Sequence, residues 1–165
     1  MAKKVSKSEP PIAAPPAEGG APPLLFQLFN EIGILAQLST TLLNRRLPDG
    51  LHASHFGILN HLSKRDFPET PAMLADAFQV TRGTMTHSLG VLGERGFIEL
   101  EADPKDGRSK IVRLLPAGRA FCGDAIAALA PAVTALSGKV SDLDLEPTLD
   151  ELRKLRVILD ENRDV

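Results

Sequence analysis

The stretch from Thr70 to Leu114 decides the fold of this 165-residue chain: TPAMLADAFQVTRGTMTHSLGVLGERGFIELEADPKDGRSKIVRL. Thr70 and Pro71 are residue types that favour a helix N-cap and the first helical position. Thr81 offers a second N-cap, and Gly96 suits the end of the helix that Thr81 begins. The apolar residues that recur at helical spacing are Met73, Leu74, Ala77 and Phe78, then Met85, Leu89 and Leu92. The pattern predicts two short helices joined by a tight turn.

Two short strands follow these helices. The runs Phe97–Glu101 and Lys110–Leu114 have alternating or β-branched character, and residues 103–107, DPKDG, lie between them. Proline followed by Asp-Gly between two such runs is a strong hairpin signal. Two helices, a tight turn and then a hairpin are the order of a winged helix-turn-helix. We therefore expect a mainly α-helical fold with a small β-hairpin wing.

Longer helices are expected on both sides of this unit. Leucine-rich and alanine-rich patterns predict helices over 24–47, 116–136 (kinked at Pro131) and about 143–160. A helix with Phe56, Leu59 and Leu62 on one face precedes a turn over 66–69. Residues 1–23 hold six prolines and predict a disordered tail. The leucine stripes exceed what a small winged lobe can cover, so we expect one domain over 24–165, with dimerisation helices over 24–47 and 116–165 around a winged lobe over 51–115.

Composition excludes several classes of protein. One cysteine rules out an intrachain disulfide framework and a cysteine-clustered zinc site. Tryptophan and tyrosine are absent, which argues against stacking of single-stranded nucleic acid on aromatic rings. No run of 18 uninterrupted apolar residues occurs, and prolines interrupt any signal-peptide core, so we expect a cytoplasmic protein without a membrane partner. The net charge is −2, yet residues 81–119 carry seven basic and five acidic side chains.

The first half of the helix after Thr81 carries small and hydrogen-bonding side chains. In a helix-turn-helix this half lies in the major groove against base edges. Threonine can bond to bases or phosphates, and its methyl group can contact thymine. The residues expected at this surface are Thr81, Arg82, Gly83, Thr84, Thr86 and His87. We expect Arg82 to contact guanine or a phosphate, and Thr84, Thr86 and His87 to contact bases.

The tip of the hairpin is cationic. Lys105, Arg108 and Lys110 lie within six residues, and an arginine on such a wing can enter a narrow minor groove. Asp103 and Asp106 have the wrong charge for a phosphate ligand. We expect them to fix the turn and to hold Arg108 by a bidentate ion pair.

From about Phe26 to its end, the chain resembles the MarR (multiple antibiotic resistance regulator) family. The segments that carry the resemblance are 70–75, TPAMLA; 80–86, VTRGTMT; 92–98, LGERGFI; and 103–110, DPKDGRSK, followed by Gly118. The resemblance implies a homodimer, joined through its first and last helices, that binds a pseudo-palindromic double-stranded DNA operator as a repressor. It also implies a ligand pocket between the dimer-forming helices and the DNA-binding lobe. The family usually has arginine at the position of Lys105, and it often has arginine at the position of His87.

Candidates for effector, metal and redox sites are less specific. The resemblance places the region of His52 and His55 beside the effector pocket, so Phe29, His52, His55 and Phe56 are candidates to contact an anionic aromatic ligand. The two histidines share a helix face, but a zinc site needs three or four ligands, so no metal and no cofactor are expected. Cys122 is either a buried inert thiol or, one turn after Arg119, a redox sensor.

No catalytic arrangement is found: the chain has no phosphate-binding glycine loop and no nucleophile elbow, so we do not expect an enzyme. Two functions remain. The first is a sequence-specific double-stranded DNA-binding transcriptional regulator, a homodimeric repressor released by a small-molecule effector. The alternative is a winged-helix protein-interaction module without DNA binding.

Overall fold

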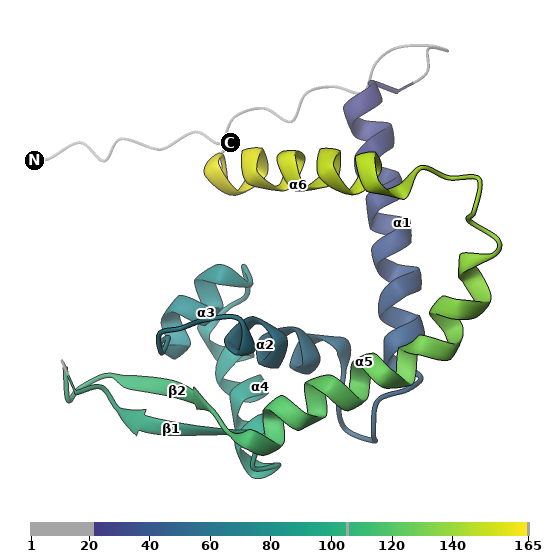
Figure 1. The fold of residues 1–165 in the computed structure, drawn as a ribbon. Helices are drawn as coiled ribbons and strands as arrows, with labels where there is room; N and C mark the ends of the chain where they lie inside the picture. Colours follow the sequence, from purple (N-terminus) through teal and green to yellow (C-terminus); the bar gives the residue numbers. More distant parts are fainter. Residues whose placement is uncertain (1–21, 105, 165) are drawn as a thin grey trace, which may run out of the picture. The chain divides into compact units, whose positions relative to one another are not determined.

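A computed structural model describes residues 22–104 and 106–164, and it confirms the predicted fold class. The elements are α1 (Leu24–Asn44), α2 (Ala53–Ser63), α3 (Pro71–Ala77), α4 (Arg82–Glu94), β1 (Ile98–Ala102), β2 (Lys110–Leu114), α5 (Pro116–Ser137) and α6 (Leu145–Glu161) (Figure 1). The predicted tail, apart from its last two residues, lies outside the described residues. The chain divides into two compact units, and the division falls within α1 after Leu38.

Helix α1 ends at Asn44, three residues earlier than the sequence predicts. The Oδ1 atom of Asn44 accepts the backbone N–H of Ala53 at 2.7 Å, so this side chain satisfies a donor at the start of α2. Residues 45–47 form turns instead of helix, before Gly50 takes the left-handed φ of 79°. Helix α1 contributes no buried residue in the single chain, although most of its residues are apolar.

The helix-turn-helix is built by caps at both ends of its helices. Thr70 Oγ1 accepts the backbone N–H of Met73 at 3.2 Å, and Thr81 Oγ1 accepts that of Thr84 at 3.1 Å. Both predicted N-caps are therefore confirmed.

Both helices also end in a left-handed residue, Gln79 (φ 51°) after α3 and Gly96 (φ 67°) after α4. The bonds that close these two ends run from Val80 N to Ala75 O and from Phe97 N to Leu92 O, each at 3.0 Å. This Schellman geometry fixes the turn between α3 and α4 and the entry into the wing. Gly96 was predicted to end its helix, and the structure confirms it.

The core lies inside the winged lobe, where α2, α3, α4, the wing and the start of α5 pack together (Figure 1). The predicted inward residues Met85, Leu89 and Leu92 are each no more than 2% exposed. On α3 the buried residues are Leu74 and Ala75, whereas Met73 points outward at 45% exposure, because its position lies on the opposite side of this short helix. On α2 the buried residues are His55, Ile58, Leu59 and Leu62, and Phe56 is only partly buried against the core.

The hairpin is antiparallel, with Ile98 paired to Leu114 and Ala102 to Lys110. Its first strand begins and ends one residue later than predicted. Glu69, expected inside a turn, forms a bridge with Val112, whose N–H donates to Glu69 O at 2.8 Å. The Glu69 side chain is buried and lies 2.7 Å from Nε2 of His61. The segment before α3 is thus tied to both the wing and α2.

Helix α5 begins beside the wing. Leu115 N donates to Phe97 O at 2.9 Å, and Gly118, Phe121, Cys122 and Ala125 are buried. By length and composition alone α5 could cross a membrane, with a mean hydropathy of 1.5 over 18 residues. The core helix of a soluble protein passes the same test, and the first half of α5 packs on the lobe.

Candidate nucleic-acid interface

The first turns of α4 present one face to the core and the other to solvent. Met85 and Leu89 are buried, whereas Thr81, Arg82, Gly83, Thr84, Thr86 and His87 are all exposed. The structure thus brings six of the nine predicted DNA-contacting residues onto one exposed helical surface. Small side chains on such a surface allow a helix to lie close to base edges.

The three threonines of this surface use their hydroxyl groups within the helix. Thr86 Oγ1 donates to Arg82 O at 2.8 Å, which leaves its methyl group and its oxygen lone pairs for an outside partner. The hydroxyl groups of Thr81 and Thr84 lie 2.9 Å apart and bond to each other. These internal bonds orient the side chains before any ligand is present.

The wing carries exposed cations. Arg108 and Lys110 are exposed, and in the described part of the chain neither side chain has an ion-pair partner; the same holds for Arg82. Lys105, the other predicted cation of the wing, lies outside the described residues. Positive side chains without internal partners are available to phosphate oxygens.

Asp106 shapes the turn in a different way from the one predicted. Its Oδ1 accepts the backbone N–H of Arg108 at 3.1 Å, and the guanidinium group of Arg108 takes no part in that bond. The predicted bidentate ion pair between Asp106 and Arg108 is therefore wrong. The Asp106 carboxylate instead accepts the backbone N–H of the residue two positions later, as in an Asx turn. Asp103 N donates to Ser109 O at 2.9 Å across the base of the turn.

A bidentate ion pair does stabilise the wing, between strands instead of within the turn. Arg113 Nε and Nη2 donate to the two carboxylate oxygens of Glu101 at 2.9 and 2.7 Å, and Arg113 Nε lies 3.8 Å from Glu99. The hydrogen bond from Arg113 lowers the pKa of Glu101 below its ordinary value. This pair was not predicted from the sequence, where its signal was two acidic residues, Glu99 and Glu101, on the strand opposite Arg113.

The histidines at the start of α2 lie close together. The ring of His55 is buried, its Nδ1 accepts the backbone N–H of His52 at 3.1 Å, and the two rings stack with centroids 5.7 Å apart. Burial lowers the pKa of His55, and the charges of His52, His87 and Arg95 lower it further. The lowered pKa favours the neutral form of His55, whose buried ring is held against the start of α2.

The remaining effector, metal and redox candidates are placed as follows. Phe29 lies half-exposed on α1, and His52 is exposed at the N-cap of α2. Within residues 22–104 and 106–164, no three His, Cys, Asp or Glu side chains form a group suited to a metal ion. Cys122 is buried, and burial raises the pKa of its thiol although Arg119 opposes the shift. A protonated thiol is a poor redox sensor.

Comparison with known proteins points to one family. A sequence profile described as MarR family matches residues 49–109, which contain α2, α3, α4, β1 and the whole turn between the two strands. A search of curated protein sequences finds no match.

Solved structures resemble the chain over most of its length. The transcriptional regulator BldR from Sulfolobus solfataricus is 27% identical, with a TM-score of 0.65, and the match covers 83% of this chain and 95% of BldR. A cysteine-to-serine mutant of MarR from E. coli, solved with operator DNA, is 25% identical, with a TM-score of 0.61 over 83% of this chain and 94% of MarR. PcaV from Streptomyces coelicolor, solved with its natural ligand, shares the fold at 19% identity, with a TM-score of 0.63 over 86% and 98% of the two chains. Residues 49–109 therefore match the MarR family, and the capped helix pair, the tight turn and the wing give the chain the fold of MarR-family transcription regulators.

Proposed function

We propose that this protein is a cytoplasmic, homodimeric repressor that binds a pseudo-palindromic DNA operator and is released by a small-molecule effector. The observation that carries DNA binding is the exposed face of α4 beside a wing whose described cations lack ion-pair partners. The surface has the small and hydrogen-bonding side chains of a major-groove helix, and Arg108 suits a minor groove or a phosphate. The operator complex of E. coli MarR adds support by analogy.

The terminal helices support a dimer. On α6 the side chains Leu145, Leu149, Leu152 and Leu159 recur at helical spacing, and each is between 37% and 53% exposed in the single chain. Helix α5 likewise exposes Ile126, Val133 and Leu136, each about half exposed. An apolar surface of this extent on a charged amphipathic helix is typical of an interface. A two-fold dimer would present two α4 helices about 34–36 Å apart, one turn of DNA.

An effector would act by favouring one arrangement of the two lobes over another. A ligand that binds better to a dimer whose α4 helices are not one DNA turn apart shifts the population away from the DNA-binding arrangement. The ligand complex of PcaV makes a small-molecule effector a reasonable expectation here. Phe29, His52, His55 and Phe56 stay candidate contacts, although His55 already uses Nδ1 within α2.

DNA binding is tested by titration with random duplex DNA at two salt concentrations. Phosphate contacts predict an affinity that falls steeply as salt rises. Replacing Arg108 with alanine should weaken binding and reduce the salt slope by about one if the residue meets a phosphate. The matched control is Arg153→Ala, which removes an exposed arginine of α6 that pairs with Asp150. A protein-interaction module would show little duplex affinity at either salt concentration, and that result would refute the proposal.

The dimer is tested by light scattering. Leu149→Glu combined with Leu152→Glu places two charges in the apolar stripe of α6 and should halve the mass of the particle. Lys154→Glu introduces the same residue type on the polar face of α6, where Lys154 is exposed and pairs with Glu151, and should leave the mass unchanged. A wild-type protein that is monomeric at micromolar concentration would contradict the proposal. The Arg108→Ala variant should remain dimeric.

A further inference from the structure

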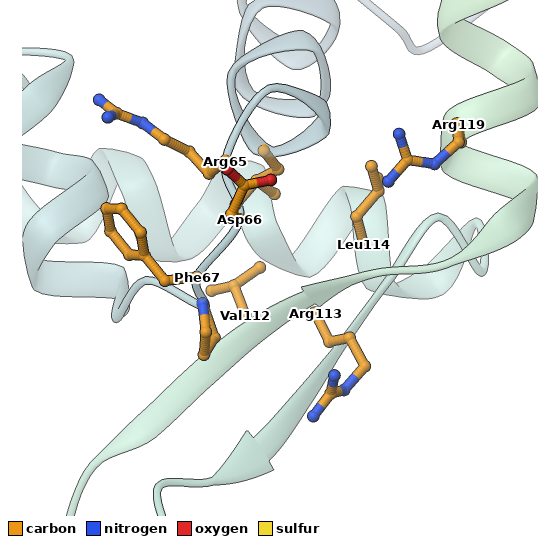
Figure 2. Close-up of a pocket in the computed structure, with 9 residues that line it drawn as sticks. Arg65, Asp66, Phe67, Val112, Arg113, Leu114 and Arg119 are labelled. Atoms are coloured by element: carbon orange, nitrogen blue, oxygen red, sulfur yellow. The ribbon is translucent and has the colours of Figure 1, made fainter.

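A pocket of about 190 Å³ lies at the base of the wing. It forms where the end of α2, the loop before α3, strand β2 and the first turns of α5 meet, as Figure 2 shows. Its apolar wall includes Leu62 and Val112, which belong to the core, and Leu114, which packs against it. This wall is therefore held by the same packing as the lobe itself. None of the effector candidates named from the sequence lines this wing-base pocket.

Two opposite charges face each other across the wing-base pocket. In Figure 2 the carboxylate of Asp66 and the guanidinium group of Arg119 point toward one another from opposite walls. They form no ion pair, and within the described residues Asp66 has no hydrogen-bond or ion-pair partner. Arg119 donates one long hydrogen bond, from Nη1 to Ser63 O at 3.4 Å. Most of its five N–H donors are therefore available to a ligand.

The two other arginines of the pocket direct their charges elsewhere. The guanidinium group of Arg113 lies on the far side of β2, where it bonds to Glu101 (Figure 2). The guanidinium carbon of Arg65 lies 5.7 Å from the centre of the Phe67 ring, and the side chain turns away from the cavity. The pocket thus offers one exposed cation and one exposed anion beside the partly buried Leu114.

We propose that the wing-base pocket binds a small zwitterion of the α-amino acid class with an apolar side chain. The planar fork of Arg119 suits a ligand carboxylate, and the carboxylate of Asp66 accepts from a ligand ammonium group. The ligand's apolar side chain would lie on Leu114, which is partly buried, whereas Val112 lies beneath the pocket floor in the core. A ligand with only a carboxylate would place a negative charge near Asp66, and a ligand with only an amine would place a positive charge near Arg119. The pocket therefore discriminates against ligands that carry one charge.

An occupied pocket would connect the wing to α5, because the ligand would contact β2 on one side and Arg119 of α5 on the other. Any effect on operator affinity rests on the proposed function above, whereas ligand binding itself does not. Calorimetry on the protein without DNA therefore tests ligand binding independently of any effect on operator affinity.

The experiment titrates the full chain with L-leucine, L-valine, L-methionine and L-phenylalanine. At least one should bind with one site per chain. The best ligand is then compared with its analogues lacking one charge; for L-leucine these are 4-methylpentanoate and 3-methylbutylamine. Each analogue should bind about tenfold more weakly or worse, the scale of a lost charge-assisted hydrogen bond.

Variants locate the binding site. Arg119→Gln and Asp66→Asn should each weaken amino acid binding about tenfold or more. Arg153→Gln and Asp124→Asn make the same charge changes at exposed positions outside the pocket and should bind as the wild type does. The proposal is overturned if no amino acid binds at millimolar concentration, if the two pocket variants bind normally, or if an analogue with one charge binds as tightly as its amino acid. A negative result here leaves the DNA titration unaffected.

Discussion

Gly118 lies where helix α5 contacts the start of the wing, and replacing it with alanine should measure how tightly the two are joined. A Cβ atom at this position would lie 2.4 Å from the carbonyl oxygen of Phe97 and 2.8 Å from Cδ1 of Leu114. Cβ atoms in real proteins essentially never approach another heavy atom closer than 3.0 Å, so the backbone at Phe97 must move by about 0.6 Å. That carbonyl is also held by the N–H of Leu115 at 2.9 Å.

The expected magnitude follows from two opposing terms. Forcing a methyl group into a packed site costs about 1–3 kcal/mol. At Gly118 the cost should lie toward the upper end of that range, because the nearest atom is the backbone oxygen of Phe97. Alanine also raises helix propensity by up to about 1 kcal/mol relative to glycine. Gly118→Ala should therefore lower the free energy of unfolding by about 1–2 kcal/mol. Gly123, in the same helix, has no atom within 4 Å of its ideal Cβ, so Gly123→Ala should raise the free energy by up to about 1 kcal/mol.

The assay is urea unfolding of both variants at one fixed protomer concentration, because the stability of a dimer depends on concentration. The unfolding free energies of the two variants should differ by about 2–3 kcal/mol. Both variants gain the same helix propensity, so this difference measures the steric cost at Gly118 alone. Gly118→Ala should also weaken DNA binding, since the displaced Phe97 leads directly into β1. If Gly118→Ala is as stable as Gly123→Ala, the contact between α5 and the wing is looser than the 2.4 Å approach to Phe97 O implies.

Three further predictions concern residues of the winged lobe. Thr86→Val keeps the shape of the side chain and loses only the oxygen that bonds Arg82 O, so site selection from a DNA library should show altered sequence preference with an unchanged salt slope. The folded-state pKa of His55 lies below its unfolded value, so its neutral form contributes stability that is present above about pH 6.5 and is lost as the pH falls toward the folded pKa. His55→Gln keeps an acceptor but does not titrate, so its unfolding free energy should fall less between about pH 7.5 and about pH 5.5 than that of the wild type; equal slopes would refute this. Gln79→Gly relieves the left-handed φ of 51° and should raise the free energy of unfolding by about 1 kcal/mol in urea, whereas a loss would contradict the Schellman assignment.

Much of the proposed DNA-binding surface could be predicted because its signals are local. Thr81, Met85 and Gly96 specify where α4 begins, which face it buries and where it ends, and each acts within a turn or two of its own position. The wing was predictable for the same reason, from a turn sequence between two alternating runs. The same reasoning failed for Asp106, because the nearby amide of Arg108 competes with its guanidinium group for the carboxylate.

The amino-acid sequence by itself determined the order of elements, the caps of α3 and α4, and the identity of the exposed residues on α4. Only the tertiary structure decided the partner of Arg113, the bridge between Glu69 and Val112, and the wing-base pocket with Asp66 opposite Arg119. Caps and turns depend on atoms a few residues apart, so the residue types name them directly. The other features bring together residues that lie 12 to 53 positions apart in the sequence. Strand register and helix packing decide which of the many possible residues come together.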